Sequence, residues 1–347
     1  MTIGTASRSL IIVVLALLTV PKVAADSAVV LMYHRFGEDR FPSTNIRVEQ
    51  FEAQLEHLQE AGYTIVPLAD VVSALTQGTP LPDRAVAISI DDAYRSVYDV
   101  AFPRLSALGY PFTVFVATDA VDEGLPAYMS WEQMREMAAA GAAFANHGAA
   151  HTYVIERLAA ETDIAWLARV RVDIEKGARR LSEELDPLDR AFAYPYGEFN
   201  SAVGDLLEEM GYVGFGQHSG AVGPNSDTRA LPRYPMAESF GDLGQFRTKV
   251  ASFPMPVVGV APWDPVTSAT RPTITVTLGE TEARLDELAC YVGGQGRVDV
   301  AWQEPARRFT VGPLQPFRPA RQRVNCTAPR NDGRYVWFSH PWFVRPQ

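Results

Sequence analysis

The stretch Ala85-Val86-Ala87-Ile88-Ser89-Ile90-Asp91-Asp92 places two adjacent acids directly after a run of mostly apolar residues. An apolar run rich in β-branched residues and bounded by polar ones is typical of a buried parallel strand. In α/β folds, sites are built at the carboxyl ends of such strands. Adjacent strand residues point to opposite sides, so one acid can bind a metal while the other acts as a base. A helix N-cap with a charged neighbour is the alternative, and it explains one acid better than two.

Around this stretch, apolar runs and helical patterns alternate at least six times. The pattern predicts strands at 29–33, 64–66, 85–90, 112–116, 143–145, 191–193 and 212–215, and helices at 49–61, 68–75, 97–108, 131–140, 161–185 and 201–210. Such alternation indicates parallel strands joined by crossover helices, in a barrel or an open doubly wound sheet. A barrel gathers strand ends in one ring, so we predict an α/β barrel over residues 26–254.

The composition changes after about residue 254, where a proline-rich passage begins. Period-two patterns follow over 273–278 and 297–302, separated by turn residues, as in half-buried antiparallel strands. We therefore predict a small β-sandwich over residues 255–347. It contains the only two cysteines, Cys290 and Cys326. In an exported protein a lone pair more often forms a disulfide than two free thiols, and this one would stabilise the fold by ~3–4 kcal/mol.

The first 25 residues have the features of a cleaved signal peptide. A weakly basic start precedes an apolar run over 10–20, and Val23-Ala24-Ala25 offers small residues for cleavage. An uncleaved anchor is the alternative, although a membrane span needs ~20 residues. We expect an exported protein, periplasmic or secreted, with no membrane span after cleavage. The net charge of -10 argues against a nucleic-acid partner. Nothing in the sequence predicts an oligomeric state.

Two of the six histidines, His147 and His151, are four residues apart in Asn146-His147-Gly148-Ala149-Ala150-His151. One helical turn or a tight loop puts both imidazoles on one side. With a carboxylate from a neighbouring strand they would form a three-ligand site that leaves a position open for water on zinc or a similar metal. Two unrelated polar residues in a surface loop are the alternative.

These motifs resemble those of the polysaccharide deacetylases, the NodB-homology or carbohydrate esterase family 4 group. Residues 89–92 are similar to the T-F-D-D motif, 147–151 to H-[ST]-x-x-H, and 194–197 to R-x-P-[YF]; 31–34 resemble an opening that many members share. The resemblance covers about residues 28–250. Residues 192–197 and 231–235 resemble the exported bacterial branch that includes poly-N-acetylglucosamine deacetylases.

The resemblance implies a deformed (β/α) barrel, related to the TIM barrel, and metal-dependent removal of acetyl groups from an N-acetylated polysaccharide such as chitin, peptidoglycan or poly-N-acetylglucosamine. It implies that Asp92, His147 and His151 hold the metal, Zn²⁺ first, with Co²⁺, Ni²⁺ or Mn²⁺ as alternatives. Asp91 would be the general base. The backbone N–H of Tyr196 would help to bind the oxyanion.

The sequence departs from the family pattern at several positions. Gly148 stands where the family has Ser or Thr, and Ala193 where it has the arginine that positions the base. We hypothesise that Arg233 takes this role from another strand end. The motif whose histidine would be the general acid is missing. His218, which follows a late strand, is the substitute we predict, and an ordinary loop histidine is the alternative.

Further residues near the motif loops are candidates for contact with a glycan. His34 would line the site or make a structural hydrogen bond. Tyr94, Trp131 and Pro195 are predicted to contact the substrate, with simple packing as the alternative for the aromatic residues. Three other functions stay open: hydrolysis of O-acetyl esters by the same fold, carbohydrate binding with weak or no catalysis, and a structural role in the cell envelope.

Overall fold

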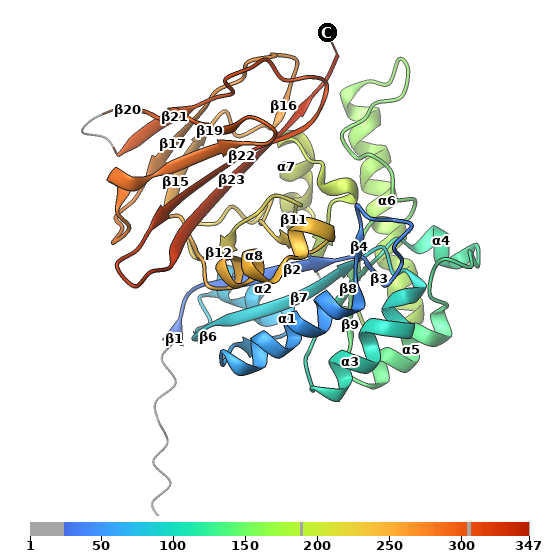
Figure 1. The fold of residues 1–347 in the computed structure, drawn as a ribbon. Coiled ribbons are helices and arrows are strands. Elements are labelled where there is room, and N and C mark those ends of the chain that lie inside the picture. Colours follow the sequence, from blue (N-terminus) through green and yellow to red (C-terminus); the bar gives the residue numbers. More distant parts are fainter. Residues whose placement is uncertain (1–23, 188–189, 304–306, 347) are drawn as a thin grey trace, which may run out of the picture.

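The computed structural model describes residues 24–187, 190–303 and 307–346. The predicted signal peptide lies outside the described residues, except for the backbone of residues 24 and 25. Among the residues described, no helix is both long and apolar enough to cross a bilayer. Figure 1 shows a mixed helix-and-strand body, blue to yellow, with a strand-rich C-terminal region, orange to red, packed on one side of it.

A curled sheet of nine strands forms the centre of the first part. Its order is β11-β10-β9-β8-β7-β2-β12, with β13 also on β2 and β5 also on β7. The bounds are β2 (Ala28–Tyr33), β5 (Thr64–Ile65), β7 (Ala85–Asp91), β8 (Thr113–Val116), β9 (Ala143–Asn146), β10 (Ala191–Ala193), β11 (Val213–Phe215), β12 (Ala221–Val222) and β13 (Tyr234–Pro235). All pairings are parallel except that of β12 with β2.

The sheet curls into a deformed barrel. Phe215, at the end of β11, forms a parallel bridge with Leu231. Strand β13 begins three residues after Leu231 and pairs with β2 at the other side of the sheet. The irregular segment 231–235 thus joins the two edges, and the predicted barrel is confirmed in its deformed form. All seven residues of β7 are buried, as a central parallel strand covered on both faces requires.

Helices connect these strands much as predicted. They are α1 (Val48–Glu60), α2 (Leu68–Gln77), the π-helix η1 (Val97–Ala101) continued by α3 (Phe102–Ala107), α4 (Thr118–Asp122), α5 (Trp131–Ala139), α6 (Asp163–Glu184), α7 (Ser201–Glu209) and α8 (Leu243–Val250), with short 3₁₀ turns η2 (Pro195–Gly197), η3 (Glu238–Gly241) and η4 (Leu285–Glu287). The helix predicted over 131–140 begins with a capping box, in which Ser130 and Gln133 exchange hydrogen bonds. Helices α4 and α8 were not predicted.

Two sheets form the C-terminal region. One has the order β14-β23-β22-β18-β19, with β16 on β23, and the other β15-β17-β21-β20. The bounds are β14 (Phe253–Pro254), β15 (Val257–Ala261), β16 (Val266–Thr267), β17 (Ile274–Leu278), β18 (Ala289–Val292), β19 (Gly296–Val298), β20 (Ala301–Gln303), β21 (Arg308–Val311), β22 (Ala320–Pro329) and β23 (Tyr335–Val344). Two-stranded pairs β1 (Ala24–Ala25) with β6 (Leu81–Pro82), and β3 (Arg35–Phe36) with β4 (Asn45–Ile46), lie at the periphery.

A single hydrophobic core joins the strands of these two sheets, as expected for a sandwich. The prediction of one strand over 297–302 is wrong. Residues 296–298 belong to one sheet and residues 301–303 to the other. The period-two pattern in the sequence continues through residues 299 and 300, although the chain passes from one sheet to the other there.

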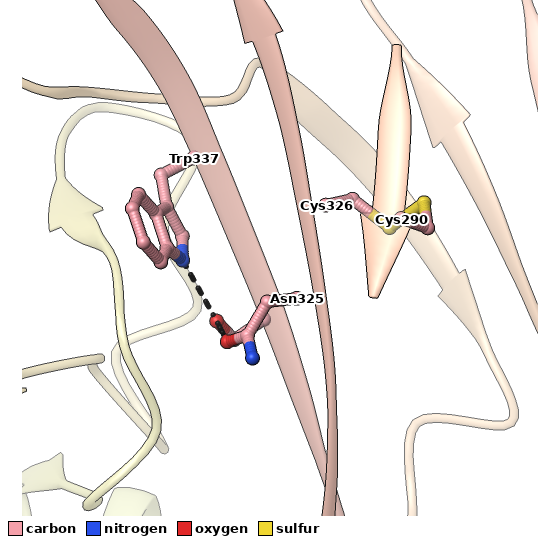
Figure 2. The surroundings of a disulfide bond; sticks show 5 residues. Cys290, Asn325, Cys326 and Trp337 are labelled. Carbon is pink, nitrogen blue, oxygen red and sulfur yellow. Dashed lines mark hydrogen bonds between the residues drawn. A yellow bond between two sulfur atoms is a disulfide. The ribbon is translucent and has the colours of Figure 1, made fainter. Parts of the chain in front are cut away.

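The predicted disulfide is confirmed. Cys290 on β18 and Cys326 on β22 are directly paired in register and bonded, with both side chains in the sandwich core. Figure 2 shows the disulfide on one side of β22 and Asn325 with Trp337 on the other. The indole N–H of Trp337 donates to Ser339 Oγ, which donates to Asn325 Oδ1. The face of this sheet opposite the disulfide therefore packs against the barrel, where the Trp337 ring contacts the ring of Tyr234.

Candidate metal centre and active site

Three of the motif residues lie in the loops after strand ends and have a left-handed backbone conformation. Asp92 follows β7 with φ of 74°, His151 has φ of 50°, and Tyr196 follows β10 with φ of 59°. Such angles are uncommon for residues other than glycine, and their clustering is typical of functional sites. All three lie near the carboxyl edge of the barrel strands, because β7, β8, β9 and β10 are parallel and in register there.

Asp92, His147 and His151 form a compact cluster. One ligand atom from each lies within 4.8 Å of the others. Nε2 of His147 is 3.2 Å and Nε2 of His151 is 3.0 Å from the same Asp92 Oδ1. The structure therefore brings together the three residues that the family resemblance implied as ligands.

The donor atoms of this cluster fit a divalent metal. Asp92 Oδ1 and His147 Nε2 are buried, and neither has a hydrogen-bond partner among the described residues. Nδ1 of His147 is 2.7 Å from the carbonyl oxygen of Ala193, a contact that makes Nδ1 the donor and leaves the lone pair on Nε2. Burial raises the pKa of Asp92, but the neighbouring imidazoles outweigh burial and hold it well below its ordinary value. Two imidazoles and a carboxylate with a free position suit zinc and similar metals.

The loop that carries the two histidines is held by polar contacts from its neighbours. Asn146 Oδ1 accepts from the N–H of Gly148, and Asp173 on α6 accepts from the N–H groups of Ala149 and Ala150. Gly148 has φ of 77°, and a Cβ there would lie 2.6 Å from Asp173 Oδ2. The glycine that departs from the family motif is therefore required by this chain's own loop.

Asp91 makes a separate, fully buried ion pair. Arg233 donates from Nη1 to Oδ1 and from Nη2 to Oδ2, both at 2.7 Å, and neither side chain is exposed. The guanidinium is itself fixed by Gly216 O and Ser89 Oγ. Burial raises the pKa of Asp91, but Arg233 and the nearby histidines outweigh it, so the net pKa is lowered. The arginine hypothesised from another strand end thus contacts the carboxylate that Ala193 cannot reach.

Two of the residues predicted to contact substrate lie at this site. Nε2 of His34, just after β2, is 3.9 Å from Asp91 Oδ2. Tyr94 lines a small pocket together with Asp92, Tyr128 and His151. The guanidinium of Arg35 lies 3.3 Å from the centre of the Tyr94 ring and holds one face of that ring.

Three other predictions are not supported by the placement of their residues. Trp131, at the start of α5, does not line the pocket of Asp92, because its indole N–H donates to Asp122 at the end of α4. Pro195 is buried in the turn η2 and offers no surface to a ligand. His218 is buried in a different cavity, against Phe199, because its strand end turns toward the C-terminal sandwich. The predicted role of His218 as general acid therefore has no geometric support.

The sequence reading missed one contact to the third motif. Arg321 on β22 donates from Nη1 to the carbonyl oxygen of Tyr196 at 2.7 Å, and its Nε lies 3.6 Å from Glu198. The Tyr196 ring stacks on Tyr153 at 3.8 Å and meets His151 edge-on. Arg321 lies 125 residues beyond Tyr196 in another sheet system, so no local pattern points to it.

Comparison with known proteins agrees with this geometry. Residues 78–215 match the family model described as polysaccharide deacetylase. A protein of Escherichia coli strain K12 named poly-beta-1,6-N-acetyl-D-glucosamine N-deacetylase is 27% identical over 238 residues, 58% of this chain and 35% of the relative. A protein of the same name from Staphylococcus aureus strain MSSA476 is 25% identical, over 61% of this chain and 79% of the relative. The match thus spans about a third of the Escherichia coli relative's length.

Solved structures share the fold of the barrel. IcaB from Ammonifex degensii has a TM-score of 0.56 and 27% sequence identity, covering 65% of this chain and 97% of that one. The Streptococcus pyogenes deacetylase PplD, solved with acetate, has a TM-score of 0.55 and 21% identity, covering 61% of this chain and 93% of that one. The family model matched by residues 78–215, the motifs and the strand-end geometry together support a polysaccharide deacetylase domain of the NodB type, the carbohydrate esterase family 4 group, within this chain.

Proposed function

We propose that this protein is a metal-dependent deacetylase that removes N-acetyl groups from an N-acetylated polysaccharide and releases acetate. One observation carries the proposal: two adjacent carboxylates have different partners. Asp91 is paired with Arg233, while Asp92 faces His147 and His151. This division separates a base from a metal ligand. The names of the Escherichia coli and Staphylococcus aureus relatives support an N-acetylglucosamine polymer as the substrate class.

Asp92, His147 and His151 would hold the metal, Zn²⁺ first and Co²⁺, Ni²⁺ or Mn²⁺ as alternatives. When bound, a metal there supplies a Lewis acid that polarises the amide carbonyl and lowers the pKa of a bound water. Burial of His147 and its contact with Ala193 O orient one imidazole before any metal arrives. The chain itself thus pre-organises the site.

Asp91 acts as the base in this proposal. The bidentate contact with Arg233 keeps the carboxylate ionised and fixes both oxygens. It accepts the proton that water loses as its oxygen adds to the amide carbon. The N–H of Tyr196 supplies a hydrogen bond to the oxyanion.

His34 replaces His218 as the proton donor in this proposal. His34 Nε2 is 3.9 Å from Asp91 Oδ2, within reach of a shared proton after a small movement. The proton taken up by Asp91 passes through His34 to the amine nitrogen as the C–N bond breaks, leaving acetate and a free sugar amine.

We further propose that the protein is exported to the periplasm or the exterior. The disulfide between Cys290 and Cys326 supports this proposal, because disulfides persist in oxidising compartments. The apolar run over residues 10–20 supports it from the sequence.

The test compares two neighbouring carboxylate variants. Asp91→Asn keeps the ligand set and removes the base, so it should retain metal by elemental analysis and lose at least ~10²-fold in turnover. Asp92→Asn should lose metal and turnover together. Acetate release is measured from β-1,6- and β-1,4-linked N-acetylglucosamine oligomers, peptidoglycan and O-acetylated xylan.

Each result has a defined meaning. Release from N-acetylated glycans by the wild-type protein supports the proposal, and release from xylan alone would replace it with ester hydrolysis. Metal loss in Asp91→Asn would contradict the division of roles. Glycan binding without acetate release from any substrate would make the protein a carbohydrate-binding module.

A further inference from the structure

A second cavity lies where the barrel meets the sandwich. It has a volume of about 370 Å³, within the range of small-ligand sites. Barrel residues after the strand end of β11 form one wall and strands β15 and β23 form the other. We call it the junction cavity. Residues that line it and enter the argument are Phe199, His218, Asn225, Trp263, Trp337 and His340.

Two buried histidines on its walls have an unpartnered ring nitrogen. His218 is 8% exposed and His340 is 5% exposed. His218 Nδ1 and His340 Nε2 have no hydrogen-bond partner among the described residues. An unsatisfied buried polar group costs about 1–3 kcal/mol, so two in one place call for an explanation. Both rings line the cavity, so a ligand with hydroxyl or amide groups would satisfy these nitrogens once each ring turned its unpartnered nitrogen toward the cavity.

The charge of the walls favours a neutral ligand. Among the described residues that line the cavity, none is a lysine or arginine, and the one acid, Asp227, is already bonded to Arg229. Burial lowers the pKa of both histidines to about 3. The positive charge of Arg323 adds to this effect at His218, and His218 adds to it at His340. At neutral pH each ring is uncharged and offers one donor and one acceptor. An anion would find no charge partner here.

The apolar part of the walls suits a sugar ring. Trp263 and Trp337 contribute indoles from the sandwich side, and Phe199 contributes a phenyl ring from the barrel side. Trp337 is held in place by its hydrogen bond to Ser339. The segment after β11 adds two further polar side chains to the cavity wall, exposed Asn225 and partly buried Ser226. Flat apolar surfaces beside neutral donors and acceptors match a pyranose with hydroxyls and an acetamide.

The junction cavity is also tied to the metal site through two loops. Phe199 follows the third motif by two residues, and His218 follows Gln217, whose side chain and backbone pack against Gly197. The same two short segments thus border the loop of Tyr196 on one side and the junction cavity on the other. A glycan bound in the cavity would be held close to the catalytic loop.

We propose that the junction cavity binds one N-acetylhexosamine unit of the glycan, as a subsite separate from the metal centre. The choice of ligand rests on the proposed function, and the cavity itself does not.

The six histidines provide the test, because they report on the two sites separately. Imidazole ¹⁵N NMR of the full-length Asp91→Asn protein is followed during titration with β-1,6- and β-1,4-linked di-N-acetylglucosamine. The signals of His218 and His340 should shift, and that of His57 on α1, which serves as the internal reference, should not. Assignment comes from His218→Gln and His340→Gln.

A pair of substitutions provides the control. Asn225→Trp places an indole at the exposed rim of the cavity and should weaken the His218 and His340 response at least 10-fold. Val172→Trp adds the same side chain at an exposed site on α6 and should leave that response unchanged.

The two proposals fail in different ways. Shifts confined to His34, His147 and His151, with His218 and His340 unmoved, would overturn the subsite and leave the deacetylase proposal standing. Shifts of His218 and His340 in a protein whose wild type releases no acetate would keep the subsite and overturn the deacetylase. An unchanged response in Asn225→Trp would also reject the cavity as the binding place.

Discussion

At the scale of single residues, the site depends on how two neighbouring carboxylates are given different surroundings. Asp91 is fully buried against Arg233, whereas Asp92 turns out of the strand with φ of 74° toward the two histidines. In a continued strand, the second acid would point to the opposite face of the sheet from the first. The backbone turn at Asp92 instead brings both acids to the same edge of the barrel.

His34→Gln tests the proton path. Glutamine keeps hydrogen-bonding capacity but cannot carry a proton, so acetate release from an N-acetylated oligomer should fall ~10²-fold with metal content unchanged. His218→Gln is the matched variant, since its ring lies in the junction cavity. Its pH–rate profile should keep the wild-type shape. A loss of the acidic or basic limb in His218→Gln, rather than in His34→Gln, would return the role of general acid to His218.

The sequence could predict the cluster of Asp92, His147 and His151 because its signals are local. Asp92 follows an apolar run, and His147 and His151 are four residues apart. Arg233 could only be offered as a hypothesis, because its contact with Asp91 depends on how the segment 231–235 closes the barrel. Trp131 does not line the pocket of Asp92, and the sequence could not show this because proximity to a motif says nothing about the direction of a side chain. Arg321 had no signal at all.

At the scale of elements, loops at strand ends are shaped by the helices and strands behind them. Gly148 sits in the histidine loop with φ of 77°, and Asp173 on α6 fills the space where its Cβ would be. Gly177 on α6 allows Asn146 and Gly148 to approach in the same way. Helix α6 is thus a template for the loop that carries His147 and His151.

Gly148→Ala tests this template. The new Cβ would collide with a carboxylate and adopt a strained φ, at a cost of about 1–3 kcal/mol. Because the strain falls on the loop of two ligands, metal affinity should drop ~10-fold, measured by competition with a chelating dye. Gly124→Ala, at φ of 64° with open space around it, carries the strain without the collision or the ligands. Equal loss of affinity in both variants would contradict a specific role for Gly148.

The contact between sandwich and barrel at Arg321 leads to another prediction. Its hydrogen bond to Tyr196 O steadies a loop whose N–H is proposed to bind the oxyanion. Arg321→Ala should lower kcat about 5- to 10-fold, with KM and metal content little changed, and Arg321→Lys should recover part of the loss. The control is Arg271→Ala, at an exposed sandwich residue whose side chain donates to Leu314 O and to no other group in the part of the chain that the structure describes. A change in KM alone would assign Arg321 to substrate contact.

At the scale of the whole molecule, the interface between barrel and sandwich contains buried polar side chains as well as apolar ones. Alternating strands and helices predicted the barrel, and period-two patterns predicted the strands of the sandwich. The packing of one on the other could not be predicted, because it depends on long-range contacts such as Trp337 with Tyr234. His218 and His340 could be read only as a loop residue and a sandwich residue, yet both line the same cavity.

This burial predicts how stability depends on pH. The folded pKa of each histidine is about 3, and the unfolded value is near 6.5. Between these values the unfolded chain binds protons that the folded chain does not. The free energy of unfolding therefore rises with pH through this window. The contribution of the two histidines to it is fully present above about pH 7 and is lost as the pH falls toward 3.

Urea unfolding at pH 7, 6 and 5 measures the effect, because most carboxylates stay ionised over that range. Each histidine should contribute a loss of about 2 kcal/mol between pH 7 and pH 5. The double variant His218→Gln/His340→Gln removes both groups, so its stability should depend less steeply on pH than that of the wild type, whatever its absolute stability. His57→Gln, a histidine on helix α1 outside the junction cavity, is the matched control and should retain most of the wild-type slope. Equal slopes in the wild type and the double variant would mean that these two rings are protonated in the folded protein, and the seam between barrel and sandwich would then be open to water.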